Sequence, residues 1–340
     1  MAAVRRRRRR VRPRFFVFLG LLTVIILASV WAARPRTPRH LPVDTKPTSA
    51  KPTLGSKAAA EAGGTWTAAP FALPQPLKGL AAAFSGGTAY LAGGLNQTSS
   101  PAVYVLTGTG LRLLANLPAG VHDAGAAVLN GTLYVLGGGQ AVPEAAAWQI
   151  ALNPPGPVQS APALFAPLSD ATAISYGSAI YLVGGYEAGA PSNRVWQYRP
   201  GAGDTVFAVL PTGVRYAAVA AAGDTLYVAG GLAAGGPTRT ASAINLRTGT
   251  VTRLPPLPYA VEHAEGLVMQ GRFWVAGGSN VGGFTQRVNV YNPSTKTWQP
   301  GPPLPAAAGD GALVPFHSGA LWIGGENGQH ALSVIWRYTP

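Results

Sequence analysis

Six pairs of adjacent glycines recur along this chain of 340 residues, and each pair ends a short apolar stretch typical of a β-strand. The pairs lie 44 to 47 residues apart, at positions 93/94, 137/138, 184/185, 230/231, 277/278 and 324/325. The stretches before them read TAYLAGG, TLYVLGG, AIYLVGG, TLYVAGG, RFWVAGG and ALWIGG. Self-similarity at such a period indicates a repeat architecture, in which each repeat is one supersecondary unit.

Each period contains four candidate strands. A run of small and apolar residues, such as GLAAAF or YAAVAA, begins about fifteen residues before the glycines and leads through a Gly- or Asp-containing turn into the glycine-ended strand. A loop of variable length follows, then a third strand such as QRVNVYNP, and a fourth that runs into prolines, as in KTWQPGPPLP. Four antiparallel strands in about 46 residues is the content of one propeller blade, so we expect an all-β protein of six blades.

The repeats resemble the kelch family, in the form found in exported bacterial proteins. The resemblance depends on the double glycine after its strand, the blade length, and the segment VYNPSTKTW at residues 290–298. It covers about residues 65–340, although the second repeat lacks the Trp of its last strand and the fourth has SAINLRTG where an aromatic is usual. The resemblance implies a six-bladed β-propeller of kelch type.

The sixth repeat is one strand short, because the sequence ends at Pro340 after its third strand. Residues 65–74, TWTAAPFALP, match the fourth-strand pattern seen in TWQPGPPLP. We therefore expect this N-terminal strand, with Trp66 as its signature, to complete the sixth blade, close the ring and cover an exposed edge.

The formal charge of +14 is concentrated at the N-terminus. Residues 1–60 carry 14 Lys or Arg and one acid, whereas the rest of the chain carries 12 basic and 11 acidic side chains. Residues 15–33 form an uncharged apolar run, which at about 1.5 Å per residue crosses a bilayer core of about 30 Å. Because the arginines precede this run, the positive-inside rule predicts a cytoplasmic N-terminus and an external body.

This pattern predicts four segments, listed here with their boundaries: an Arg-rich cytoplasmic tail at 1–14, a transmembrane signal anchor at 15–33, a Pro/Thr/Ala/Lys-rich linker at 34–64, and the propeller at 65–340. A cleaved signal peptide ending near Ala32 is the alternative, and it also exports the body, then as a secreted protein. The arginine run has no interleaved aromatics, so we do not expect nucleic acid as a partner.

Polar residues gather at one phase of the repeat, fifteen and fourteen residues before the first glycine of each pair. In a propeller, equivalent positions form a ring, and the first strands begin at one mouth of the central channel. The candidate ligand-binding residues at this mouth are Lys78, His122, Asp123, Asp170, Arg215, Tyr216, Glu262, His263 and Asp310. They either bond only to backbone and water in the loops that enter the strands, or form a pocket of mixed charge in which Arg215 or Lys78 holds an anionic group.

The glycine pairs themselves do not indicate chemistry, because none is followed by a helix start or by Gly-Lys-Ser/Thr, the context of a phosphate loop. The chain has no cysteine, which excludes disulfides, thiolate metal sites and the cross-linked cysteine cofactor of galactose oxidase, a kelch-like enzyme. We expect no metal and no other cofactor.

Two functions remain. The first is a membrane-anchored, extracytoplasmic binding module for a carbohydrate, a cell-wall component or a protein, which would use either the mouth or the variable loops after the glycines. The alternative is an exported carbohydrate-active enzyme, similar to the bacterial kelch protein that epimerises sialic acid. Its candidate catalytic residues are Glu262, His263 and Arg215, as acid, base and carboxylate-binding groups.

Overall fold

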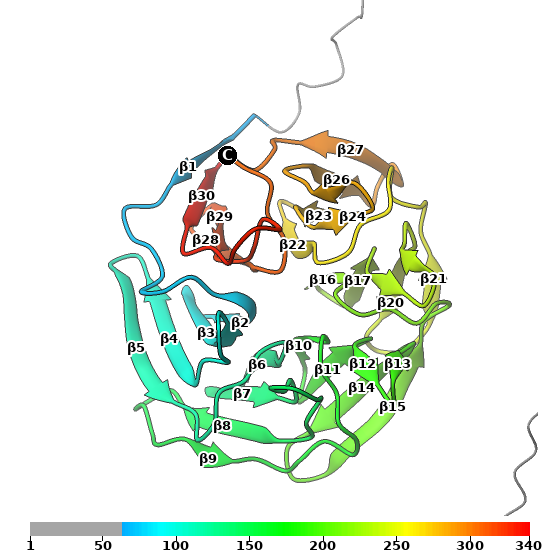
Figure 1. Cartoon of the computed structure of the whole chain (residues 1–340). Helices are drawn as coiled ribbons and strands as arrows, with labels where there is room; N and C mark the ends of the chain where they lie inside the picture. The colour runs from blue at the N-terminus through cyan, green and yellow to red at the C-terminus, as the bar shows by residue number, and fades with distance from the viewer. Residues whose placement is uncertain (1–62) are drawn as a thin grey trace, which may run out of the picture. The chain divides into compact units, whose positions relative to one another are not determined.

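The computed structural model describes residues 63–340, which form a ring of six four-stranded antiparallel sheets around a central channel (Figure 1). The predicted tail, transmembrane segment and nearly all of the linker lie outside the described residues. Within the described part the chain contains strands and no helix, so none is present there that could cross a membrane. The predicted all-β, six-bladed fold is confirmed.

Each blade is built from strands that follow one another in the sequence, from the channel outward. The first three blades comprise β2 (Lys78–Ser85), β3 (Thr88–Leu95), β4 (Ala102–Thr107) and β5 (Gly110–Asn116); β6 (Gly125–Leu129), β7 (Thr132–Leu136), β8 (Ala147–Ala151) and β9 (Gln159–Ser160); and β10 (Thr172–Tyr176), β11 (Ala179–Val183), β14 (Arg194–Arg199) and β15 (Gly203–Val209). The next two comprise β16 (Ala218–Ala222), β17 (Thr225–Ala229), β20 (Ala241–Asn245) and β21 (Val251–Arg253); and β22 (Glu265–Met269), β23 (Arg272–Ala276), β26 (Val288–Asn292) and β27 (Thr297–Gly301).

Three blades carry a short extra hairpin in the loop after their glycine pair. These hairpins are β12 (Tyr186–Glu187) with β13 (Ala190–Pro191), β18 (Leu232–Ala233) with β19 (Gly236–Pro237), and β24 (Ser279–Asn280) with β25 (Gly283–Phe284). The variable loops of the sequence are therefore partly ordered by backbone pairing in the third, fourth and fifth blades.

The sixth blade joins the two ends of the propeller. It consists of β28 (Ala312–Phe316), β29 (Gly319–Ile323), β30 (Ile335–Thr339) and, on its outer edge, β1 (Thr65–Ala68). Trp66 pairs with Tyr338 across this edge, and its indole Nε1 donates a hydrogen bond of 3.1 Å to the carbonyl of Pro302 in the fifth blade. The predicted closure is confirmed, although regular pairing ends at Ala68 rather than at residue 74.

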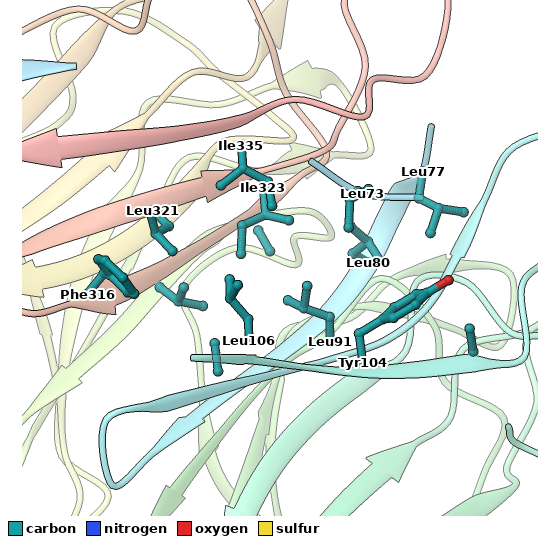
Figure 2. Packing of buried hydrophobic residues seen from close by; sticks show 14 residues of the cluster. Leu73, Leu77, Leu80, Leu91, Tyr104, Leu106, Phe316, Leu321, Ile323 and Ile335 are labelled. Atoms are coloured by element: carbon teal, nitrogen blue, oxygen red, sulfur yellow. The ribbon is translucent and has the colours of Figure 1, made fainter. Parts of the chain in front are cut away.

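The segment after β1 remains attached to the sixth blade. The amides of Ala69, Leu73 and Leu77 donate hydrogen bonds of 2.8, 2.9 and 3.0 Å to carbonyls in and just before β30. Leu73 and Leu77 are almost fully buried and pack with residues of the first and sixth blades in one hydrophobic cluster (Figure 2). The closing segment therefore contributes side chains to the core as well as a strand to the sheet.

The glycine pairs form a backbone contact between neighbouring blades. In every pair the second glycine donates its N–H to a carbonyl at the entrance of the next blade, as Gly231 does to Val261 at 2.8 Å. The first glycine lies against the same carbonyl, so that a Cβ on Gly230 would stand 2.6 Å from the oxygen of Val261. Both glycines of each pair have positive φ. The pairs therefore have a structural role, because only glycine combines this backbone conformation with so close an approach.

Candidate functional site

The residue fourteen positions before each glycine pair belongs to a closed ring of backbone hydrogen bonds around the channel axis. Each of these residues donates its amide to the carbonyl of the equivalent residue in the preceding blade, and the first donates to the sixth, with N···O distances of 2.8 to 3.1 Å. We call these six residues the axial ring: Gly79, Asp123, Asp170, Tyr216, His263 and Asp310.

All six residues of the axial ring have a left-handed backbone, with φ between 53° and 60°. Among residues other than glycine, Asp, Asn and His adopt this conformation most readily, which accounts for four of the five non-glycine members. Tyr216 is the member that backbone preference does not explain. The left-handed backbone therefore explains in part why polar residues occur at this position of the repeat. It does not explain the tyrosine.

The axial ring surrounds the entrance to a central channel whose cavity volume is about 150 Å³. Below the ring the wall consists mainly of small and apolar residues of the innermost strands, among them Ala82, Ala126, Ile174 and Val219, together with the carboxyl group of Glu265. The channel is thus polar at its entrance and lined mainly by small and apolar residues further in.

The mouth lies just outside this ring, where two hollows of about 210 Å³ each open beside the channel. One hollow is lined by Lys78, Leu95 and Glu326, and the other by Tyr186 and Arg215. They share three residues as a common wall: His122, Asp123 and Tyr216. A ligand larger than one such hollow would have to lie across this wall.

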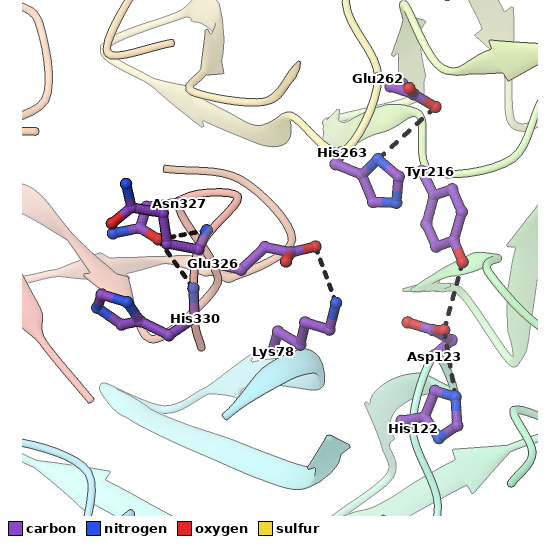
Figure 3. Close-up of polar contacts among 10 residues, drawn as sticks. Lys78, His122, Asp123, Tyr216, Glu262, His263, Glu326, Asn327 and His330 are labelled. Atoms are coloured by element: carbon purple, nitrogen blue, oxygen red, sulfur yellow. Dashed lines mark hydrogen bonds and ion pairs between the residues drawn. The ribbon is translucent and has the colours of Figure 1, made fainter. Parts of the chain in front are cut away.

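Eight of the nine residues predicted for the mouth line the channel or one of these hollows. The exception is Glu262, whose Oε2 lies 3.6 Å from Nδ1 of His263 on the side away from the other mouth residues in Figure 3. Neither of these two atoms has a hydrogen-bond partner. Of the two consecutive residues, only His263 faces the channel.

Tyr216 connects two sides of the mouth. Its ring stacks on the imidazole of His263, with centroids 3.8 Å apart and planes at 26°, and its hydroxyl donates a hydrogen bond of 3.4 Å to Oδ2 of Asp123 (Figure 3). Burial, followed by the charges of Arg215 and Lys78, lowers the pKa of His263 to about 4. The imidazole is therefore neutral at pH 7 and stacks without a charge.

Arg215 is held by aromatic faces and one carboxylate. Its guanidinium lies 4.9 Å from the ring centre of Tyr186 and 5.1 Å from that of Tyr216, and its Nη1 donates a hydrogen bond of 3.2 Å to Oδ2 of Asp170. The Asp170 side chain is only 4% exposed, whereas that of Arg215 remains 29% exposed. The cation is thus fixed in orientation while part of it still faces the hollow.

The carboxyl groups of the axial ring are held in a poorly solvated space. Burial, and after it the charge of Asp170, raise the pKa of Asp123 to about 7. Burial and the charges of Asp123, Glu265 and Glu326 raise the pKa of Asp310 well above its usual range. A carboxyl group that is half-protonated near neutral pH can both donate and accept a proton, and Asp123 meets that description at the mouth.

Three residues of the mouth were not identified from the sequence as parts of the site. Glu326 forms an ion pair of 3.0 Å with Lys78 (Figure 3). Tyr186 packs against Arg215, and Ser99 Oγ lies 2.8 Å from Nδ1 of His122. Glu326 and Tyr186 both come directly after a glycine pair. Each forms an isolated β-bridge with the residue fifteen positions before the first glycine of that pair. Their constant position in the repeat could have identified these two residues from the sequence. Ser99 has no such position in the repeat.

Among residues 63–340 no group of three His, Cys, Asp or Glu side chains lies close enough together to hold a metal ion. The mouth therefore offers hydrogen bonds, one fixed guanidinium, an amine–carboxylate pair and stacked rings to an incoming molecule.

Comparisons with known proteins agree with the repeat pattern. The Kelch motif model matches residues 214–258 and 263–305, the fourth and fifth blades. A solved structure entitled "Structure of YjhT" superimposes with a TM-score of 0.69 at 17% sequence identity, over 78% of this chain and 95% of the other. No curated protein matches significantly by sequence. At this identity the structural likeness bears on the fold alone.

Proposed function

We propose that this chain, a six-bladed propeller of the kelch-repeat family, is a binding module whose ligand occupies the mouth of the central channel. Kelch propellers commonly act as interaction modules. The ligand is a carbohydrate, a cell-wall component or a protein that presents an anionic group to Arg215, with polar groups that meet His122, Asp123 and Tyr216.

The observation that carries this proposal is the fixed, partly exposed guanidinium of Arg215. Two tyrosine faces and Asp170 hold the group in one orientation, so a ligand would not have to order it on binding. A planar guanidinium recognises carboxylates by paired hydrogen bonds. Tyr216, which adopts a left-handed backbone at some cost, supports Arg215 on one side and meets Asp123 on the other.

The matching experiment uses the full-length protein and a panel of carboxylated and neutral saccharides and peptides, with affinity measured by calorimetry. We expect at least one carboxylated ligand to bind and Arg215→Gln to weaken it about 10- to 150-fold, because a charged hydrogen bond contributes about 1.5 to 3 kcal/mol. Arg253→Gln, on the exposed outer strand β21, is the matched control and should change the affinity less than twofold.

Two results would contradict this proposal. One is that Arg215→Gln binds as tightly as the wild type while keeping its melting temperature. The other is that affinity is lost instead on changing the loop tips, for example the fully exposed Val281. The second result would show that the ligand binds to the variable loops.

The proposal includes display of the propeller outside the cell membrane, attached through residues 15–33. Its support is the apolar run of 19 residues preceded by eight arginines within residues 5–14. Protease added to intact cells or spheroplasts should then digest the propeller, and a body that stays protected would contradict the location.

An enzymatic role as a carbohydrate epimerase or mutarotase is the second candidate, and one observation favours it. Asp123 combines a pKa of about 7 with a hydrogen bond from Tyr216 at the channel mouth, so it is a better proton-transfer group than His263, whose pKa of about 4 makes it a weak base. Under this alternative the wild type accelerates mutarotation of sialic acid, followed by NMR, and Asp123→Asn abolishes the acceleration. A wild type without acceleration would remove this reaction from consideration.

A further inference from the structure

One carboxyl group in the channel has no counterpart in the other blades. Glu265 is the first residue of β22, two residues beyond His263, and its side chain lines the channel below the axial ring. The other five blades place small residues at this phase, namely Ala81, Gly125, Thr172, Ala218 and Ala312. Desolvating a carboxyl group among small residues is costly, and packing does not explain why the fifth blade departs from the repeat at this position.

Glu265 has no hydrogen-bond or ion-pair partner in the contacts of residues 63–340. Its side chain is half-buried, and desolvation in the channel raises its pKa to about 8. Asp310 and Asp123 line the same channel, and the charges of Asp123 and Glu265 both act on Asp310. The nearest cations are already engaged, because Lys78 pairs with Glu326 and Arg215 with Asp170. Three carboxyl groups therefore line one cavity. Lys78 acts on Asp123 and Asp310, and Arg215 acts on Asp123, but no counter-charge acts on Glu265.

The cavity has room for such a counter-charge. Its volume of about 150 Å³ corresponds to roughly ten water-sized sites. Glu265 lies two residues below the axial ring, which at about 3.3 Å per residue along a strand places it about 6.5 Å inside the entrance. A metal ion does not fit this arrangement, since no three acidic or imidazole groups in residues 63–340 converge closely enough to ligate one.

We propose that the central channel is a binding site for an organic cation, specifically a primary alkylammonium group such as a lysine-like side chain, with Glu265 and Asp310 around its charged head. The four-carbon stem of such a group spans the entrance, where the stacked rings of Tyr216 and His263 line its path. The site differs from the anion site at Arg215 and does not depend on it. A ligand that carries both charges could occupy the two together.

The affinity is expected to depend on pH, because ionisation of the carboxyl groups supplies the attraction. Glu265 and Asp123 lose their protons on passing pKa values of about 8 and 7, whereas an alkylammonium keeps its proton to about pH 10. Binding should therefore strengthen as the pH rises from 5.5 to 8.5. The charged and titratable groups that face this site from the surrounding blades are Lys78, His122, Asp123, Asp170, Tyr186, Arg215, Tyr216, His263, Asp310 and Glu326.

The test measures binding of n-butylammonium chloride to the full-length protein by calorimetry at pH 8.5 and pH 5.5, with butanol and sodium butyrate as neutral and anionic probes. We expect n-butylammonium to bind at least tenfold more tightly than either probe at pH 8.5, and at least tenfold more weakly at pH 5.5. Glu265→Gln, which keeps the shape of the side chain, should weaken binding at least tenfold. Glu144→Gln, an acid outside the channel lining on the loop after the second glycine pair, should change it less than twofold.

The proposal would be overturned if the wild type bound n-butylammonium no better than butanol, or if Glu265→Gln bound it equally well. Either result would leave Glu265 as a protonated group in a water-filled channel. Because these probes carry no carboxylate except butyrate, failure here is distinguishable from failure of the Arg215 site, which the carboxylated panel tests separately.

Discussion

Deletion of residues 65–74 is expected to destabilise the entire propeller, lowering its melting temperature by at least about 10 °C. The deletion removes strand β1 with its pairing to β30, the hydrogen bond from Trp66 to Pro302, and the buried side chain of Leu73. Burial of one leucine alone contributes about 1.5 to 3 kcal/mol, and each kcal/mol corresponds to about 2 to 4 °C in a domain of this size. The outer edge of β30 would also be left unpaired.

The measurement is thermal unfolding followed by circular dichroism or calorimetry. Deletion of ten residues from the predicted linker, at 45–54, is the matched control and should leave the melting temperature unchanged. If the variant that lacks 65–74 melted at the same temperature as the wild type, the closing segment would be dispensable, and the sixth blade would be stable with three strands.

Replacement of Gly230 by alanine is expected to destabilise the protein by at least about 3 kcal/mol. Gly230 has a φ of +68°, and an added Cβ would lie 2.6 Å from the carbonyl oxygen of Val261 and 3.0 Å from its Cγ1. The blades would have to separate to relieve these contacts, which would stretch the hydrogen bond from Gly231 to Val261. The cost therefore combines backbone strain with a weakened contact between two blades.

Gly223 in the same blade provides the matched control. Its φ of +54° is similarly left-handed, but nothing lies within 4 Å of an added Cβ. Gly223→Ala should therefore cost only the backbone strain of about 1 to 2 kcal/mol, measured for both variants by urea unfolding. Equal losses in the two variants would mean that the approach of the next blade does not require glycine at position 230.

The repeat made the architecture predictable from the sequence, because the glycine pairs mark the same point in every blade. Their spacing set the number of blades, and the incomplete sixth repeat identified Trp66 as part of the closing strand. The pairs recur for a physical reason, since each forms the same hydrogen bond to the next blade. Such backbone constraints recur in every blade, so they can be recognised in a single sequence.

The arrangement of side chains at the mouth could be predicted only where it follows from a residue's position in the repeat. The sequence brought Asp123, Tyr216 and His263 to one ring, but it did not indicate that a closed set of backbone hydrogen bonds holds them there. Glu262 and His263 are consecutive and were expected to act together, yet neighbouring residues on an extended chain face different ways, and only His263 lines the channel. The contact of Tyr186 with Arg215 joins different blades, and the period contains no information on such pairs.

The central claim is that the mouth of the channel is the ligand site, and a crystal structure of the protein soaked with the tightest ligand of the carboxylated panel tests it most directly. The account predicts that the ligand lies over the wall formed by His122, Asp123 and Tyr216, with its carboxylate within hydrogen-bond distance of the Arg215 guanidinium. A ligand bound on the outer strands, on the loop tips or at the opposite face of the propeller, with the mouth empty, would contradict it.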